Sequence, residues 1–266
     1  MWPIGHFYFA GIEHFYFAPT ESKQQVDKTH KRFLFLAIVN APTYEWMTGL
    51  GGVQNIADTL EILHRLTPDR WHLFVVQLFK DKLRTGKPFW ELCCALNLYS
   101  RRRRPANYLE IGVRRGKSMA QVACTSRDCD IVGFDAWITP YAEVDNPGPE
   151  SVSAEMLRLG HRGKLELISG DSRDTVPWFL KQRPNLRFDL VTVDGDHSEE
   201  GASRDLRNVA PWIAAGGILV FDDLTNPNCP LAGVWNRFRE EFGSDFVFHQ
   251  NLDDHQGTGI AVRKPF

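Results

Sequence analysis

The segment of this sequence best suited to binding a ligand is an apolar run that ends in an acid and turns into a glycine-rich loop. Residues 108–111 contain Glu110, Gly112 follows directly, and Gly116 comes four residues later, before a helix-like stretch. Glycines at a strand-to-helix turn let a ligand approach backbone N–H groups closely. The carboxylate of Glu110 would repel a polyphosphate, but it would attract a ligand that carries hydroxyls and an ammonium group.

The loop partly matches two nucleotide-binding motifs. A dinucleotide fingerprint needs a glycine where Arg114 stands, so that interpretation fails. A P-loop needs one more residue between Gly112 and the run 116–118. The run 190–194 nevertheless resembles the strand whose terminal acid binds magnesium in P-loop proteins. A P-loop-like NTPase therefore remains an alternative, as does a structural turn that binds nothing.

Further short apolar runs downstream also end in acids. Those acids are Asp135, Asp171, Asp194 and the pair Asp222 and Asp223. Helix-like segments separate the runs, and parallel strands joined by helices bring their carboxyl ends to one edge of a sheet. The pattern predicts an α/β, Rossmann-like, doubly wound sheet with a ligand crevice along that edge. Asp135, 25 residues after Glu110, would lie at the tip of the neighbouring strand, where it could accept hydrogen bonds from a ribose.

From about residue 107 to its end, the chain resembles the class I S-adenosylmethionine-dependent methyltransferases. The resemblance implies that Asp135 binds the cofactor ribose and that Asp171 contacts the adenine amino group. The cofactor contacts that it implies are Glu110, Gly112, Gly116, Ser118, Asp135, Ala136, Asp171, Ser172 and Asp194. It also implies seven strands, mostly parallel, with N-terminal helices before them and an antiparallel hairpin of residues 245–250 and 258–263 at the end.

Two segments of the sequence point to one subgroup of this family. Residues 194–198 and 214–223 are similar to metal-dependent O-methyltransferases of the catechol and macrolide-sugar kinds. Asp194, Asp222 and Asp223 would meet at the sheet edge, where three carboxylates repel one another unless a cation or protons neutralise them. Mg²⁺ suits such oxygen ligands. The resemblance assigns these three acids to Mg²⁺, and the alternative is that they are solvated strand ends, helix caps or cofactor contacts.

His197 lies three residues after Asp194, where the catechol-type enzymes have a lysine base. Imidazole titrates near neutrality, so it could remove a hydroxyl proton whose pKa a metal has already lowered. We therefore expect catalysis to involve His197 and Asp194. The alternative is a structural histidine.

The composition of the sequence argues against several classes of binding partner. The 266 residues have a formal net charge of -2, which gives no overall attraction to nucleic acid or to an anionic membrane. The five cysteines form neither a disulfide framework nor a zinc-binding pattern. The sequence contains no apolar run of about 18 residues and no secretory signal pattern at its start, which favours a cytoplasmic protein.

The chain divides into three predicted parts. Residues 1–46 form an aromatic extension in which the pattern of residues 6–10 recurs at 14–18. Residues 47–104 form a helical cap, because apolar residues recur there at steps of three and four. Residues 105–266 form the methyltransferase domain. The aromatic extension makes a homodimer plausible, and the long loop 137–150 is expected to close over the cofactor or acceptor.

The expected function is transfer of a methyl group from S-adenosylmethionine to a hydroxyl oxygen of a small molecule or sugar. Besides the NTPase, a catalytically silent binding module with the same fold is a further alternative. The sequence does not identify the acceptor.

Overall fold

The computed structural model describes residues 50–66, 68, 70–86, 91–140, 145–252 and 256–265. The predicted aromatic extension, residues 1–46, lies outside the described residues, and so does the middle of the loop 137–150. The boundaries of the three predicted parts, the cytoplasmic location and the homodimer stay predictions.

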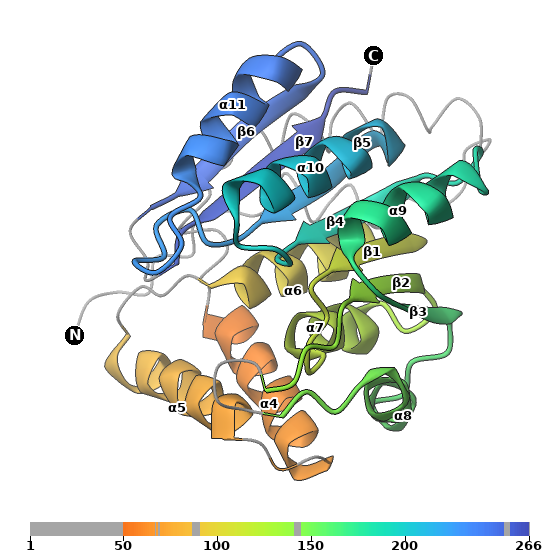
Figure 1. Cartoon of the computed structure of the whole chain (residues 1–266). Coiled ribbons are helices and arrows are strands. Elements are labelled where there is room, and N and C mark those ends of the chain that lie inside the picture. Colours follow the sequence, from red (N-terminus) through yellow and green to blue (C-terminus); the bar gives the residue numbers. More distant parts are fainter. Residues whose placement is uncertain are drawn as a thin grey trace, which may run out of the picture.

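A seven-stranded sheet forms the centre of the described chain (Figure 1). Its strands are β1 (Asn107–Ile111), β2 (Asp130–Asp135), β3 (Leu165–Ser169), β4 (Phe188–Val193), β5 (Ile213–Phe221), β6 (Phe246–Asn251) and β7 (Thr258–Arg263). The spatial order is β3-β2-β1-β4-β5-β7-β6. The first five strands run parallel, whereas β7 is antiparallel to both β5 and β6. The predicted doubly wound sheet with its C-terminal hairpin is confirmed.

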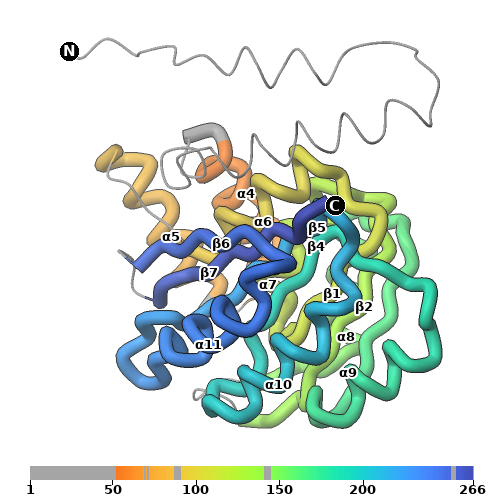
Figure 2. The backbone as a smooth tube through the Cα atoms, turned by 90° about the horizontal axis from the view of Figure 1, so that it is seen from above, coloured from red at the N-terminus to blue at the C-terminus, as the bar shows by residue number. Residues whose placement is uncertain are grey.

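Helices cover both faces of the sheet (Figure 1). One face carries α4 (Leu50–Leu66), α5 (Arg70–Thr85), α6 (Leu92–Arg103), α7 (Lys117–Thr125) and α8 (Pro149–Arg158). The other carries α9 (Ser172–Lys181), α10 (Glu199–Val209) and α11 (Ala232–Phe242), with a 3₁₀ turn, η1 (Ala210–Trp212), before β5. Figure 2 shows α4 and α5 on the side of the molecule away from α9 and α10.

The central strands are buried on both faces, which explains their nearly continuous apolar sequence. Side chains alternate between faces along a strand. Tyr108 therefore packs into the core beneath α6 and α7, and Leu109 packs into the opposite core beneath α9, α10 and α11. The same alternation directs the side chain of Glu110 to the α6 and α7 face of β1.

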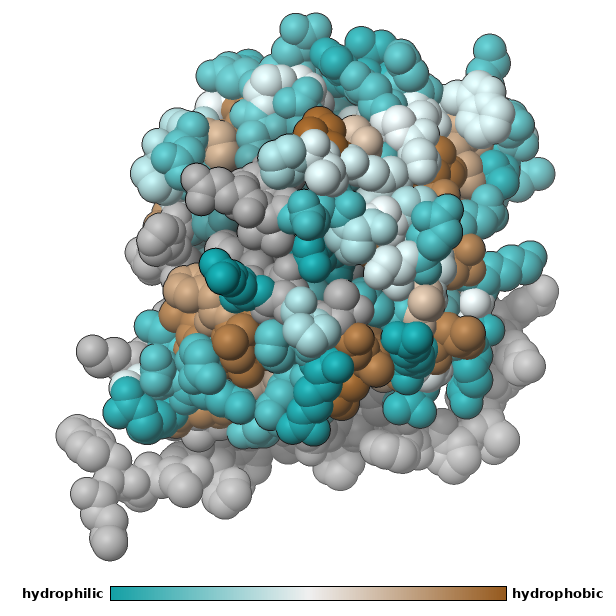
Figure 3. Space-filling model, turned by 60° about the horizontal axis from the view of Figure 1, so that its bottom comes forward, coloured by the Kyte–Doolittle hydropathy of each residue, from teal (hydrophilic) through white to brown (hydrophobic). Residues whose placement is uncertain are grey.

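The N-terminal helices pack against the main domain. Helices α4, α5 and α6 share an apolar cluster that contains Ile56, Leu60 and Phe79, and α6 also contributes to the core beneath the sheet. α6 begins at Leu92, where the Glu91 carboxylate accepts a hydrogen bond from the backbone N–H of Cys93 at 2.6 Å. Figure 3 shows hydrophobic side chains scattered among hydrophilic ones on one face of the molecule.

The length and polarity of the helices in the described ranges do not suit a membrane span. Each is too short or too polar to cross a bilayer.

Candidate active site at the carboxyl edge of the sheet

A cavity of about 460 Å³ lies at the carboxyl ends of the parallel strands. Loops after β1, β2, β3, β4 and β5 line it, and His72 of α5 and Gln256 join them. The sequence-predicted residues that line the cavity are Gly112, Ser118, Asp135, Ala136, Asp171, Ser172, Asp194, His197, Asp222 and Asp223. The folded chain thus brings most of the predicted site residues to one cavity, and only Glu110 and Gly116 are not among its lining residues.

Gly112 lies where two backbone segments meet. Its φ is +92°, and a Cβ atom there would lie 1.8 Å from the backbone oxygen of Asp194. No side chain fits that space, so the glycine lets the loop after β1 cross the loop after β4. Gly116 has φ +70° and caps α7, and a Cβ atom there would lie 3.1 Å from Cε of Met156. Gly112 is therefore required by the lack of space, and Gly116 is favoured by its left-handed backbone conformation.

Glu110 lies inside the protein, behind the cavity wall. Its side chain is fully buried and accepts hydrogen bonds from the hydroxyls of Tyr108, at 3.0 Å, and Ser118. Burial raises the pKa of Glu110 to about 8, against the lowering effect of these hydrogen bonds. Glu110 therefore holds Ser118, which does line the cavity. Direct contact between Glu110 and a ligand stays a prediction.

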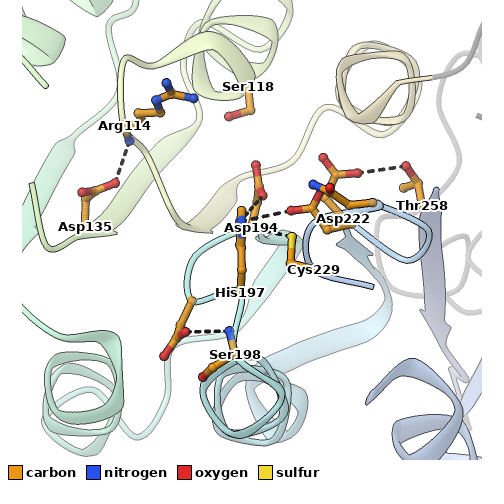
Figure 4. A network of polar contacts seen from close by, with 12 residues as sticks. Arg114, Ser118, Asp135, Asp194, His197, Ser198, Asp222, Cys229 and Thr258 are labelled. Atoms are coloured by element: carbon orange, nitrogen blue, oxygen red, sulfur yellow. Dashed lines mark hydrogen bonds and ion pairs between the residues drawn. The ribbon is translucent and has the colours of Figure 1, made fainter. Parts of the chain in front are cut away.

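Asp135 is held by backbone groups from two loops. Its carboxylate accepts a hydrogen bond from the N–H of Arg114 at 2.7 Å (Figure 4), and a second one from the N–H of Trp137 at 2.6 Å. Both donor residues have positive φ, +49° and +51°. A carboxylate has about four lone-pair sites, so these two bonds leave capacity for ligand hydroxyls.

Asp171 and Ser172 begin α9 at the next strand end. The Asp171 carboxylate accepts a hydrogen bond from the N–H of Arg173 at 2.9 Å, and this cap is joined by an ion pair to the Arg173 guanidinium. These bonds lower the pKa of Asp171. The Ser172 hydroxyl donates to Oδ2 of Asp205 at 3.0 Å. Asp205 is fully buried, and burial raises its pKa to about 7.

His197 lies between two carboxylates of neighbouring strand ends. Its Nε2 is 3.0 Å from Oδ2 of Asp223 and 3.6 Å from Oδ1 of Asp194 (Figure 4). Asp194 raises the pKa of His197 by hydrogen bonding, against the lowering effect of burial. The next residue, Ser198, caps α10 by accepting a hydrogen bond from the N–H of Gly201 at 3.1 Å. The start of α10 thus positions the imidazole over the end of β4.

Asp222 and Asp223 follow β5 and are both buried. Burial and repulsion from Asp194 raise the pKa of each. Asp222 accepts a hydrogen bond from the Thr258 hydroxyl at 3.2 Å, and Asp223 accepts one from the Asn226 amide at 2.8 Å. The three predicted acids thus line one cavity. In the described part of the chain, however, the side chains whose potential metal-ligand atoms lie close to one another are those of His197, Asp223 and Cys229.

Several residues of this region escaped the sequence analysis. Cys229, from the loop between β5 and α11, places Sγ 3.4 Å from Nδ1 of His197. Lys117 lines the cavity and forms a buried ion pair with Glu91. Asp205 appears in the sequence as one polar residue in the middle of a helix. No local pattern marks such residues, because each contact joins segments distant in the sequence.

Comparisons with known proteins concern the family and the fold of this chain. A family model described as a methyltransferase domain matches residues 109–224. No curated protein sequence matches the chain. The S-adenosylhomocysteine-bound methyltransferase PaMTH1 of Podospora anserina is similar in structure, with 14% identity, a TM-score of 0.51, and coverage of 93% of this chain and 99% of that one.

Two further solved structures have similar scores. CalS11, a TDP-rhamnose 3'-O-methyltransferase of calicheamicin biosynthesis, has 20% identity and a TM-score of 0.51, covering 92% of this chain and 96% of that one. TomG, an O-methyltransferase from Streptomyces achromogenes in complex with S-adenosylmethionine, has 18% identity and a TM-score of 0.51, covering 92% and 100%. At these identities the likeness concerns the fold. The family match indicates a methyltransferase domain at residues 109–224, and the described chain has the seven-stranded fold of these methyltransferases.

Proposed function

We propose that this chain transfers the methyl group of S-adenosylmethionine to a hydroxyl oxygen of a small-molecule or sugar acceptor. The observation that carries the proposal is the single cavity that joins the glycine loop and Asp135 to the cluster of His197, Asp194 and Asp223. One half of this cavity suits a nucleoside, and the other offers groups that handle protons. The names of CalS11 and TomG, both O-methyltransferases, support the choice of an oxygen acceptor.

The proposed cofactor half comprises the ends of β1, β2 and β3. Asp135 would accept hydrogen bonds from the ribose hydroxyls, and Asp171 with Ser172 would contact the adenine beside Ala136. The loop from Gly112 to Gly116, with Ser118, would bind the amino-acid end of the cofactor through backbone N–H groups and the hydroxyl. The buried carboxyl of Glu110 would support this end through Ser118.

The proposed reaction is an in-line displacement at the sulfonium methyl group. The acceptor oxygen forms a bond to the methyl carbon, the sulfur–carbon bond breaks, and sulfur keeps the electron pair. The protein contributes chiefly by aligning the two reactants. The acceptor's proton passes to a ring nitrogen of neutral His197, and the adjacent carboxylates of Asp194 and Asp223 stabilise the resulting imidazolium.

The donor chemistry of the acid cluster fits a hard cation. Asp194, Asp222 and Asp223 offer carboxylate oxygens, which Mg²⁺ prefers, and their mutual repulsion favours a positive charge among them. When bound, Mg²⁺ would supply charge that lowers the pKa of an acceptor hydroxyl. Protonated His197 offers a positive charge to the same acids, so the ring and the ion would compete for Asp194 and Asp223.

The first test is calorimetry with S-adenosylmethionine and with ATP. We expect binding of S-adenosylmethionine and none of ATP, because the carboxylates of Asp135 and Asp194 line the cavity and would repel a polyphosphate. Binding of ATP alone would favour the P-loop-like NTPase. Transfer of a labelled methyl group to a panel of sugar and catechol acceptors then tests turnover. Binding of the cofactor without methylation of any acceptor would favour the silent binding module.

The metal is tested by removal. We expect turnover to disappear in EDTA, to return with Mg²⁺, and to fall strongly in Asp222→Asn, while calorimetry shows little change in cofactor affinity. Asp245→Asn, an acid before β6 and outside the cavity lining, is the matched control. Full activity in EDTA would remove the metal from the proposal and leave His197 as the partner of the acids.

A further inference from the structure

Three side chains with different ligand atoms meet at the end of β5. Sγ of Cys229 lies 3.4 Å from Nδ1 of His197, and Oδ2 of Asp223 lies 3.0 Å from Nε2 of the same ring (Figure 4). One ligand atom from each residue can be chosen so that all three lie within 4.8 Å of one another. This set differs from the three aspartates considered for Mg²⁺, and the two sets share only Asp223.

The loop after β5 holds Cys229 in this position. Asp223 has φ +65°, which turns the chain sharply at the strand end. The Asn226 amide donates to the Asp223 carboxylate at 2.8 Å, and the N–H of Cys229 donates to the Asn226 carbonyl at 3.2 Å. The N–H of Leu231 returns to the Asp223 carbonyl at 3.0 Å. The loop therefore folds back on Asp223, and the thiol faces the imidazole.

The ligand atoms suit zinc better than magnesium. Mg²⁺ prefers oxygen ligands, whereas Zn²⁺ binds sulfur, imidazole nitrogen and carboxylate oxygen together. Tetrahedral Zn²⁺, with bonds of about 2.3 Å to sulfur and about 2.0 Å to nitrogen, places those two atoms roughly 3.5 Å apart. The observed separation of 3.4 Å between Sγ and Nδ1 is close to this value. Three protein ligands would leave a fourth position open.

We propose that His197, Asp223 and Cys229 form a binding site for a thiophilic divalent cation of the Zn²⁺ type, and that its occupation blocks the active site. On binding, the Sγ–H bond of Cys229 breaks, the proton leaves to solvent, and a sulfur–metal bond forms. The ring offers Nδ1 to the cation, the Asp223 carboxylate turns from Nε2 toward the cation, and Nε2 stays beside Asp194. Nearby Asp222 adds negative charge, which favours a dication.

Occupation of this site removes two groups from the proposed reaction. His197 bound to a cation cannot accept the acceptor's proton, and Asp223 can no longer stabilise an imidazolium. Zn²⁺ is therefore an inhibitor, in contrast to the Mg²⁺ proposed for the oxygen ligands. Only this inhibitory part rests on the proposed function, because binding of the cation can be measured without turnover.

Binding is tested with Co²⁺, a spectroscopic substitute for Zn²⁺, on the full chain. Thiolate bound to Co²⁺ gives an intense charge-transfer absorption that imidazole and carboxylate ligands do not give. We expect this absorption to saturate at one equivalent of Co²⁺ and to be displaced by Zn²⁺. It should vanish in Cys229→Ser and persist in Cys124→Ser, the matched control at another partly buried thiol. Circular dichroism and melting temperature verify that both variants fold.

Two results would overturn the site: no charge-transfer absorption in the wild-type chain, or an undiminished absorption in Cys229→Ser. Inhibition is measured next, each protein relative to its own activity in the absence of Zn²⁺, and Cys229→Ser should need at least about 10-fold more Zn²⁺ than the wild type or Cys124→Ser. Equal inhibition of all three proteins would overturn the inhibitory role. If no acceptor is methylated at all, the proposed function fails, while the Co²⁺ spectrum still decides the site.

Discussion

The two halves of the cavity are built in different ways. At the ends of β1 and β2, backbone groups determine the shape: Gly112 allows two loops to cross, and two backbone N–H groups hold Asp135. At the ends of β4 and β5, side chains determine it, because His197 lies between Asp194 and Asp223. Figure 4 shows the halves on either side of Asp194. Steric fit of the backbone thus determines the shape of the first half of the cavity, and the balance of side-chain charges determines that of the second half.

The acids of the two regions illustrate this difference. Asp171, in the first half at the end of β3, has a lowered pKa because Arg173 donates hydrogen bonds to it. Asp222 and Asp223 have raised pKa values because they are buried beside other carboxylates. Arg173 already balances the charge of Asp171, whereas a bound cation or a proton would stabilise Asp222 and Asp223. Changes in the first half should therefore affect folding and cofactor affinity, and changes in the second should affect turnover.

The largest effect is expected from Gly112→Ala. Its Cβ atom would lie 1.8 Å from the Asp194 backbone oxygen at a φ of +92°, so the two loops must separate. We expect loss of cofactor binding and a destabilisation of several kcal/mol, on the order of 3–5, as for severe overpacking with backbone strain. Thermal unfolding and calorimetry measure both.

Gly86→Ala is the matched control for Gly112→Ala. It has φ +65° with no atom within 4 Å of the added Cβ, so only the backbone strain remains. We expect a loss of about 1 kcal/mol there. Equal melting temperatures for the two variants would contradict the steric account of the first half.

The second prediction concerns His197→Ala. If His197 accepts the acceptor's proton, kcat should fall by roughly 10²–10⁴ while the cofactor's Kd stays unchanged. The loss should shrink at high pH, where the acceptor deprotonates unaided. A pH series of kcat for the wild type, His197→Ala and the control His64→Ala on α4 measures it. A normal kcat in His197→Ala would show that His197 has a structural role only.

The third prediction concerns Asp205, which lies under the junction of the halves, against Ser172 and near Gly195. Burial raises the folded-state pKa of this acid to about 7 from the ordinary 3.8. The unfolded chain therefore loses the proton first, and stability falls as pH rises from about 4 to about 7. Asp205→Asn should match the wild type near pH 4.

At pH 8 the buried Asp205 of the wild type is ionised, whereas the amide of Asp205→Asn stays neutral. The variant should then be more stable than the wild type by up to about 4 kcal/mol, the equivalent of a shift of about three pKa units. Denaturant unfolding at both pH values measures the difference, with the exposed Asp174→Asn of α9 as the control for loss of one charge. An equal gain at pH 4 and pH 8 would show that the effect does not come from ionisation.

The smallest effect is expected from Asp135→Asn. Its amide nitrogen would face one of the two backbone N–H donors, so one hydrogen bond is lost and the ribose contact is weakened. We expect about 10- to 100-fold weaker binding of S-adenosylmethionine, equivalent to roughly 1–3 kcal/mol, with near-normal kcat at saturation. A fall in kcat at saturating cofactor would instead show that the two halves are not separable.

Much of the fold follows from local pattern. Apolar runs that end in acids predicted the five parallel strands, because a parallel sheet buries both faces of its strands. Apolar residues at steps of three and four predicted the helices around α4 and α5. Gly112 was recognised because few other residues tolerate its backbone conformation. Such signals lie within a few residues of one another, so they survive without knowledge of the folded chain.

Other features depended on contacts across the fold. The burial of Glu110 and its hydrogen bonds with Tyr108 and Ser118 could not be read from the sequence, because they depend on how β1 packs against α7, and its contact with a ligand stays a prediction. Cys229 meets His197 across 32 residues because the loop after β5 folds back. The sequence alone thus determined the strands of the sheet, the acids at their carboxyl ends and the glycine turn, because local steric constraints and burial encode these features. Only the tertiary structure decided which charged groups neutralise one another, since that depends on distances between separate loops.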